Sequence, residues 1–219
     1  MDLRPTVSVT TSQPGCLLFP GALDRDAQRS LVADIRAMLR KAPLFVPSMP
    51  RTGKPLSVRM SNGGTLGWVA DRSGYRYQSH HPTTNEPWPP IPDALITLWQ
   101  SVAPTAPPPE ACLINWYGPD AKMGLHQDRD EQEFGAPVVS VSLGDDALFR
   151  LGGPTRGGKT EAIRLTSGDV LVLGGPARLC YHGVSRIYPG TSTLLDAPGR
   201  INLTMRRVTP SPAILGETQ

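Results

Sequence analysis

The chain has 219 residues, of which 39% are hydrophobic and 19% are charged. This length fits one domain with a sizeable buried core. The 22 glycines and 24 prolines favour many turns and short strands over a helical bundle. A formal net charge of +3 is mildly basic, which is compatible with a nucleic-acid partner without establishing one.

The three cysteines argue against two common classes of small structural site. Cys16, Cys112 and Cys180 are scattered and form no CxxC pair, so neither a disulfide framework nor a zinc site is favoured. Cys112 and Cys180 lie in apolar contexts and are expected to be buried thiols. No apolar run approaches the roughly 18 residues of a membrane span, and no apolar signal segment opens the chain. We therefore expect a cytoplasmic protein with no membrane partner.

Two helices are predicted in the first half of the chain. Residues 1–15 are polar and rich in Pro, Thr and Ser, and are predicted to be flexible. Between Asp24 and Lys41 the apolar residues keep helical spacing on one face. A second helix is predicted to begin near Asp93, a residue type that caps helices, and to end at the proline-rich run 103–109.

The segment from Arg51 to Trp88 lies between these helices and combines aromatic with basic residues. The aromatic residues are Trp68, Tyr75, Tyr77 and Trp88, and the basic ones are Arg51, Lys54, Arg59, Arg72 and Arg76. Such a mixture suits stacking on bases and contact with phosphates. The alternative is an irregular hairpin whose aromatic side chains fill the core, and this packing role is favoured for Trp88. His80 and His81 are expected to be surface residues.

From Ala111 onward the pattern changes to short strands separated by turns. The predicted strands are 111–117, 137–143, 147–151, 161–165, 169–173 and 200–207. Many short strands after two helices predict a mainly β fold with flanking helices (α+β), in the form of a sandwich or jelly roll. The expected organisation is a single domain over residues 16–207, followed by a tail over 208–219.

The segment from Arg200 to Arg206 alternates without interruption between polar and apolar residues. As a strand it places Ile201, Leu203 and Met205 on one face. The other face carries Arg200, Asn202, Thr204 and Arg206. Two guanidinium groups that project the same way from a rigid strand suit a small dianion, because arginine presents a planar fork to a carboxylate.

A candidate metal site comes from His126 and Asp128, which point the same way if the segment is extended. His182 follows a strand-like stretch and is the candidate third ligand. Two histidines and one carboxylate are the ligand set of mononuclear non-haem Fe(II) oxygenases. Zinc hydrolysis is the competing use of this set, but it would not explain the two arginines. A dianion site beside such a metal site indicates 2-oxoglutarate.

Several motifs together resemble the AlkB family of alkylated-DNA repair dioxygenases. They are Met60-Ser61-Asn62, Leu66-Gly67-Trp68, Asn115-Trp116-Tyr117, the segment from Leu125 to Glu131, the segment from Pro137 to Gly144, Tyr181-His182-Gly183 and the segment from Arg200 to Arg206. The resemblance spans residues 15 to 207 and implies a double-stranded β-helix (jelly roll) core. It also implies an N-terminal nucleotide-recognition lid, over roughly residues 45–90.

The resemblance also implies roles for individual residues. His126, Asp128 and His182 would be the iron ligands. Arg200 and Arg206 would hold the carboxylates of 2-oxoglutarate, helped by Asn115, Tyr117 and Asn202. Trp68, Tyr75, Asp130 and Arg156 would contact the damaged base or its backbone, with the base between Trp68 and His126.

The implied activity is oxidative demethylation of bases such as 1-methyladenine and 3-methylcytosine, with Fe(II), 2-oxoglutarate and O2. The expected partner is alkylated DNA, preferably single-stranded, or RNA, and the expected state is a monomer. Lys54, Leu56 and Trp116 depart from the family pattern and bear on lesion preference. The alternatives are a related oxygenase that acts on RNA, protein or a small molecule, and a non-catalytic nucleic-acid binding module.

Overall fold

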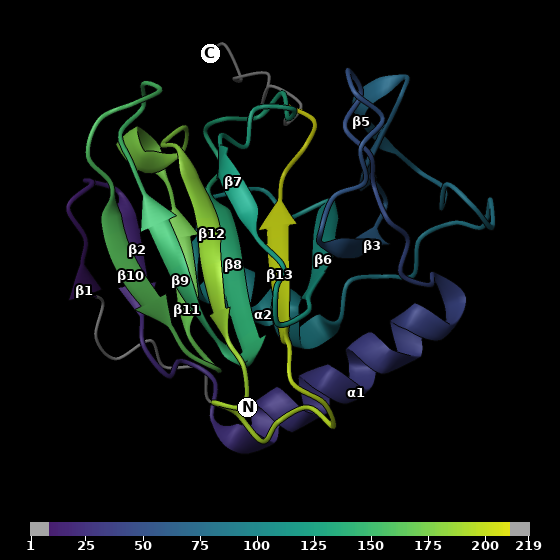
Figure 1. Ribbon diagram of the computed structural model, residues 1–219, viewed down its shortest axis with the longest axis horizontal. Coiled ribbons are helices and arrows are strands. Elements are labelled where there is room, and N and C mark those ends of the chain that lie inside the picture. Colours follow the sequence, from purple (N-terminus) through teal and green to yellow (C-terminus); the bar gives the residue numbers. More distant parts are fainter. Residues whose placement is uncertain (1–8, 211–219) are drawn as a thin grey trace, which may run out of the picture.

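The computed structural model describes residues 9–210 (Figure 1). Helices α1 and α2 span Arg25–Lys41 and Asp93–Val102. The strands are β1 (Val9–Thr10), β2 (Cys16–Phe19), β3 (Arg59–Gly64), β4 (Gly67–Asp71), β5 (Gly74–Gln78), β6 (Ala111–Tyr117), β7 (Met123–His126), β8 (Val138–Gly144), β9 (Asp146–Leu151), β10 (Glu161–Leu165), β11 (Val170–Leu173), β12 (His182–Tyr188) and β13 (Arg200–Arg206). A 3-10 turn, Gly175–Ala177, precedes β12.

The strands form two large sheets and one small one. The larger sheet has the order β1-β2-β11-β8-β13-β6-β3, and the second sheet has the order β10-β9-β12-β7. These two sheets make the layered body of the molecule, and β4 pairs with β5 in a separate hairpin (Figure 1). The predicted mainly β, jelly-roll fold is confirmed.

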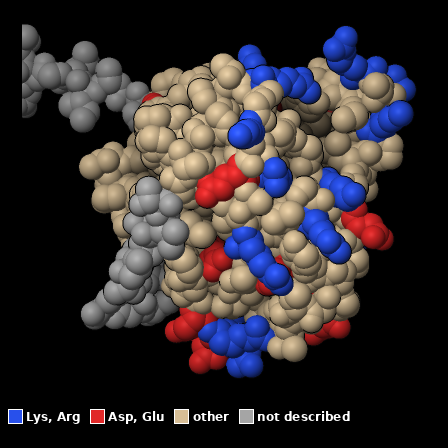
Figure 2. All heavy atoms as spheres, turned by 60° about the vertical axis from the view of Figure 1, so that its left-hand side comes forward, with Lys and Arg blue, Asp and Glu red and all other residues tan. Residues whose placement is uncertain are grey.

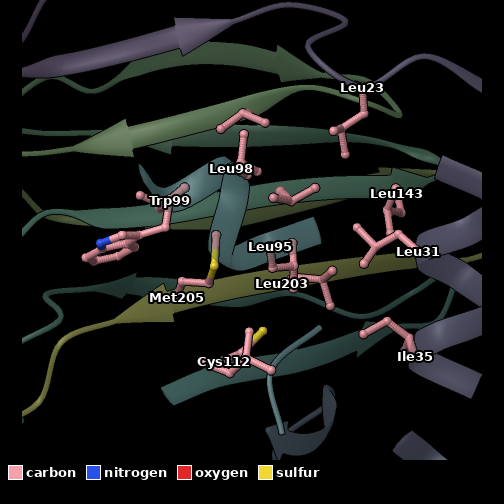
Figure 3. Close-up of a cluster of buried hydrophobic side chains, with 14 of the residues drawn as sticks. Leu23, Leu31, Ile35, Leu95, Leu98, Trp99, Cys112, Leu143, Leu203 and Met205 are labelled. Carbon is pink, nitrogen blue, oxygen red and sulfur yellow. The ribbon is translucent and has the colours of Figure 1, made fainter. Parts of the chain in front are cut away.

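Two apolar cores hold these layers together. One lies between the helices and the outer face of the larger sheet, where Leu31 and Ile35 of α1 and Leu95 of α2 meet β13 (Figure 3). The other lies between the two large sheets and includes Phe149 and Leu171. A cavity lies beside this second core. Polar side chains of β13 and β6 point into it from the same side.

Strand β13 has the predicted division between its faces. Leu203 and Met205 are fully buried in the helix-side core, and Ile201 lies beside them. The polar residues Arg200, Asn202, Thr204 and Arg206 face the other sheet and line the cavity. Every residue of β13 is buried, because β6 and β8 pair with it on both edges.

Both predicted helices are present, but they begin differently. Asp24 caps α1, since its carboxylate accepts a hydrogen bond from the Ala27 amide at 2.8 Å. Asp93 was expected to cap α2 but is its first helical residue. The cap position is Pro92, which makes no side-chain hydrogen bond, and the carboxylate of Asp93 favours the helix only through its place in the first turn.

The structure adds strands within the predicted N-terminal segment and the predicted lid. Strand β1 lies within residues 1–15, which were expected to be flexible, and pairs with β2, while residues 1–8 lie outside the described part. The predicted lid, residues 45–90, includes β3, which is an edge strand of the larger sheet. Only the β4–β5 hairpin and its flanking loops stand apart from that sheet. Most of the predicted tail, residues 211–219, also lies outside the described residues.

The three thiols are buried, as expected for Cys112 and Cys180. Burial raises the pKa of the Cys112 thiol to about 12. Neither helix within residues 9–210 is long and apolar enough to cross a membrane.

Leu203→Ala should lower the free energy of unfolding by about 2–5 kcal/mol, because it leaves a cavity at a fully buried position between β13 and the helices. The matched control is Leu125→Ala, whose side chain is 45% exposed, and its effect should stay within about 0.5 kcal/mol. Urea unfolding followed by circular dichroism measures both. Equal effects would contradict the described burial.

Candidate metal and co-substrate site

The pairing of β12 with β7 brings two distant histidines together. His182, the first residue of β12, lies directly opposite His126, the last residue of β7, and their ring centroids are 4.6 Å apart. Gly183 permits this approach. A Cβ atom at Gly183 would lie 2.6 Å from the Met123 carbonyl oxygen and 2.8 Å from that of Gly124, so any side chain would push the strands apart.

Asp128 completes a set of three potential ligands. It lies two residues after His126, where its Oδ1 is 3.7 Å from Nε2 of His126 and its Oδ2 is 3.8 Å from Nε2 of His182. One ligand atom from each residue lies within 4.8 Å of the others. The group is the His–Asp–His triad that the sequence predicted, and it fits an iron ion.

Backbone carbonyls orient both imidazoles. Nδ1 of His126 lies 2.9 Å from the Gly124 carbonyl oxygen, and Nδ1 of His182 lies 3.0 Å from that of Cys180. A carbonyl can only accept, so Nδ1 of each neutral ring carries the proton. The lone pair of each Nε2 is then free for a metal, and the ring orientation is fixed, as is usual for metal-binding histidines.

The electrostatic environment favours the deprotonated forms that bind metals. Burial, and then the neighbouring His126, lower the pKa of His182 to about 4, so this ring is neutral at pH 7. Burial alone would raise the pKa of Asp128. Arg206, followed by the two histidines, outweighs burial and lowers that pKa below its usual value. A neutral imidazole and a carboxylate are therefore already present before any metal binds.

A recess lined by guanidinium groups adjoins the triad. Arg200 donates from Nη2 to Ser142 Oγ at 2.9 Å, and Arg206 donates from Nη2 to Asp128 Oδ2 at 2.9 Å. The recess also contains Asn115 and Asn202, which bond to each other, and Tyr117, whose ring lies under Arg200. These five residues are the predicted co-substrate ligands, and all line the same cavity.

The unpaired atoms of this recess test whether a dicarboxylate fits it. Among the described residues, the buried side-chain atoms without a hydrogen-bond partner are Asn115 Oδ1, Arg200 Nε and Nη1, and Arg206 Nη1. An unpaired buried donor is costly, so such atoms are rare in folded proteins. Two guanidinium groups with free N–H groups in one cavity match the carboxylates of 2-oxoglutarate, so the residues fit this co-substrate.

The predicted substrate residues fall into two groups. Trp68 on β4 donates from Nε1 to Asp130 Oδ2 at 2.8 Å and stacks on Tyr75 of β5 with ring centroids 5.7 Å apart. Trp68, Tyr75 and Asp130 are therefore brought together. Arg156 is exposed in the loop between β9 and β10, and no hydrogen bond or ion pair among the described residues joins it to the other three.

Two residues named in the sequence analysis, Trp116 and His81, have roles outside the cavity. Trp116 lies on the opposite face of β6 from Asn115 and Tyr117, packs against the helix-side core and has the Arg59 guanidinium 6.0 Å above its ring. His81, expected at the surface, is buried. Its Nε2 donates to the Pro43 carbonyl and its Nδ1 accepts from the amides of Thr83 and Thr84, so it stabilises the loop that follows β5.

Like Trp116, Lys54 and Leu56 depart from the expected family pattern, and both lie in the loop before β3. Lys54 is exposed, whereas Leu56 packs against the core between the sheets. Trp88 is buried, as the packing interpretation predicted.

Sequence reasoning did not single out Glu131 and Arg178. Both are buried, and they form an ion pair of 3.2 Å beside the triad. Glu131 follows Asp128 by three residues in a loop, where no periodicity distinguishes a buried carboxylate from an exposed one. Only the tertiary structure, which brings Arg178 from the end of a distant 3-10 turn, identifies the pair.

Comparison with known proteins agrees with this site. Residues 15–206 match the 2OG-Fe(II) oxygenase superfamily. The chain is also 51% identical over 197 residues to the alpha-ketoglutarate-dependent dioxygenase AlkB homolog of Caulobacter vibrioides, a match that covers 90% of this chain and 89% of the relative. The chain belongs to the AlkB family of 2OG-Fe(II) oxygenases.

Two further AlkB-family proteins are similar over most of the chain. Identity to the alpha-ketoglutarate-dependent dioxygenase AlkB of Escherichia coli is 42% over 187 residues, covering 83% of this chain and 85% of that protein. The solved structure of OsALKBH1 is 33% identical and superposes with a TM-score of 0.78, covering 92% of this chain and 100% of that one. Membership in the family carries the cofactors Fe(II), 2-oxoglutarate and O2.

His182→Ala should weaken Mn(II) binding by at least ~100-fold, because loss of a direct ligand should cost no less than loss of an outer partner of a metal site. Isothermal titration calorimetry with Mn(II), a redox-stable substitute for Fe(II), measures the effect. The matched control is His80→Ala, since His80 is exposed and its ring bonds only to the Ser79 hydroxyl. Unchanged Mn(II) affinity in His182→Ala would remove this residue from the metal site.

Proposed function

We propose that this AlkB-family enzyme removes methyl groups from N-alkylated bases such as 1-methyladenine and 3-methylcytosine in DNA, and so repairs alkylation damage. The observation that carries the proposal is one cavity that contains a His–Asp–His triad and two arginines with unpaired N–H groups. The E. coli relative bears the name alpha-ketoglutarate-dependent dioxygenase AlkB, and a relative from Arabidopsis thaliana is named a DNA N(6)-methyladenine demethylase.

The polar side chains of the cavity form two sets in this proposal, one for the metal and one for the co-substrate. His126, Asp128 and His182 hold Fe(II). Arg200 and Arg206 bind the carboxylates of 2-oxoglutarate, with Asn115, Tyr117 and Asn202 around it. Bound iron, with 2-oxoglutarate and O2, supplies the oxidation of the methyl C–H bond, which yields succinate, CO2 and formaldehyde.

The protein's own contribution is to position groups and to exclude water. The ion pair with Asp128 aligns Arg206 beside the triad, and burial strengthens both contacts because the local dielectric is low. The same burial keeps the Tyr117 hydroxyl protonated, since it raises the pKa of this side chain. A protonated hydroxyl can donate a hydrogen bond to a co-substrate carboxylate.

The surface around the cavity supports a nucleic-acid substrate. Trp68 and Tyr75 offer aromatic faces on which an unstacked base can pack, and Asp130 can accept a hydrogen bond from an exocyclic amino group. Exposed basic residues within residues 45–90 include Arg51, Lys54, Arg59 and Arg72. Figure 2 shows Lys and Arg side chains gathered toward the upper right of the face in view, with few acidic ones among them. Arg156 is assigned to contacts with the phosphate backbone.

Single-stranded DNA is the preferred substrate form in this proposal, and the enzyme acts as a monomer. A lesion that blocks base pairing makes extrusion less costly, and in a single strand no pairing has to be broken. RNA is the second candidate substrate, because a Schizosaccharomyces pombe relative, 32% identical over 113 residues, is named a tRNA demethylase.

The decisive experiment combines purified protein with Fe(II), ascorbate, 2-oxoglutarate and matched DNA or RNA oligonucleotides that contain one 1-methyladenine. We expect formaldehyde release and loss of the methyl mark, faster on single-stranded than on duplex DNA. Succinate formation with no loss of methyl from any oligonucleotide would redirect the search to another substrate of the same oxygenase site.

Trp68→Ala should lower kcat/KM for the methylated oligonucleotide roughly 5- to 150-fold, because base–aromatic stacking is worth about 1–3 kcal/mol. Trp116→Phe should leave the ratio of 1-methyladenine to 3-methylcytosine repair unchanged, because Trp116 faces the helix-side core. Steady-state kinetics on both oligonucleotides measures these effects. A changed lesion ratio in Trp116→Phe would show that the residue reaches the substrate.

A further inference from the structure

Glu131 is a buried carboxylate to which the proposed function assigns no role. It lies three residues after Asp128 and contacts three segments that are distant in sequence. The Tyr77 hydroxyl of β5 donates to Oε1, Arg206 Nε of β13 lies 3.3 Å from the same oxygen, and Arg178 Nη2 lies 3.2 Å from Oε2. A single carboxylate therefore joins the lid strand to the co-substrate arginine.

Arg178 holds this carboxylate in place. Its guanidinium donates to the Asp128 carbonyl at 2.7 Å and to the Ala136 carbonyl at 3.0 Å, so it binds both ends of the loop that contains Glu131. The guanidinium also lies 5.4 Å from the ring centroid of Phe134, which covers it. Glu131 is thus rigidly placed before any ligand enters the cavity.

The charges of this cluster give Glu131 an electrostatic role. Arg178 and Arg206 are two buried cations, and Asp128 and Glu131 are two buried anions within ion-pair distance of them. A metal ion held by Asp128 would take up part of the charge of that carboxylate. Glu131 would then be the carboxylate that balances one of the two arginines, so that one positive charge would remain for a carboxylate of the co-substrate.

Glu131 is also linked to the β4–β5 hairpin, through Tyr77. Tyr77 lies opposite Trp68 in the β4–β5 hairpin, and Trp68 bonds to Asp130, the neighbour of Glu131. Burial raises the pKa of Tyr77, so its hydroxyl remains a donor. The position of β5, which also carries Tyr75, therefore depends on a hydrogen bond to the carboxylate that contacts Arg206.

We infer that Glu131 is a positioning residue that aligns Arg206 for 2-oxoglutarate and fastens the lid strand β5 with the same carboxylate, so that co-substrate binding and lid order are coupled. This inference rests on the proposed role of Arg206 in the oxygenase site. It does not depend on the identity of the methylated substrate.

The test uses Mn(II)-loaded protein without nucleic acid. Calorimetry measures the Kd for 2-oxoglutarate, and hydrogen–deuterium exchange measures protection of the β4–β5 amides with and without 2-oxoglutarate. Glu131→Gln should raise the Kd at least ~10-fold and speed exchange in β5. Glu133→Gln is the matched control, because this glutamate bonds only to Gly135 within its own loop and should behave as wild type. Arg206→Ala is the positive control for loss of 2-oxoglutarate.

Tyr77→Phe separates coupling from simple stability, because it removes one hydroxyl and leaves the contact between Glu131 and Arg206. We expect its Kd to stay within about threefold of wild type, while β5 exchanges faster and no longer responds to 2-oxoglutarate. This variant decides the question if Glu131→Gln fails to fold, as judged by circular dichroism.

Two results would overturn the inference. One is a Kd in folded Glu131→Gln equal to that of Glu133→Gln, and the other is equal protection of β5 by 2-oxoglutarate in wild type and Tyr77→Phe. Failure of the proposed demethylation is a separate outcome, seen only in the oligonucleotide assay.

Discussion

The register between β7 and β12 is the constraint on which the site depends. A strand pair displaced by one residue would turn His126 and His182 to opposite faces of the sheet, and no shared ion could then bind. The register is held by backbone hydrogen bonds and by the lack of a side chain at Gly183, which lets the two backbones approach. The two histidines can therefore share a metal ion only if β7 and β12 pair in this register.

The site also contains buried charged groups that lack some of their hydrogen-bond partners. Arg200 and Arg206 are held by Ser142 and Asp128, yet each keeps N–H groups without a partner. A protein that only needed stability would do better with apolar residues of similar volume at these positions. A dianion that binds these unpaired groups would require little rearrangement of the recess, because the donors are already in place.

Much of this site was predictable from sequence because alternation along one strand determines which residues share a face. The residues Arg200 to Arg206 gave the polar and apolar faces of β13 correctly, and the spacing of His126 and Asp128 gave two ligands. The third candidate ligand, His182, was harder to predict from spacing, because its contact with His126 depends on tertiary strand pairing. The motif resemblance, more than the periodicity, supported that choice.

The misjudged residues share a physical cause. His81 lies in a polar segment, but its ring is buried by Phe45 and Trp88 and bonded to backbone groups that the sequence does not reveal. Glu131 and Arg178 are charged residues whose burial depends on each other, so neither is recognisable alone. The pairing of β3 with β6 was not foreseen either, because glycine and polar residues hide the strand in the sequence.

The two faces of β6 can be altered independently of each other. Asn115 and Tyr117 face the cavity, whereas Ile114 and Trp116 face the helices. Homologous enzymes can therefore diverge in thermal tolerance through one set of positions while their chemistry stays unchanged through the other. Substitutions meant to raise thermal stability should begin at the helix-facing positions. Substitutions meant to change lesion preference should leave those positions unchanged.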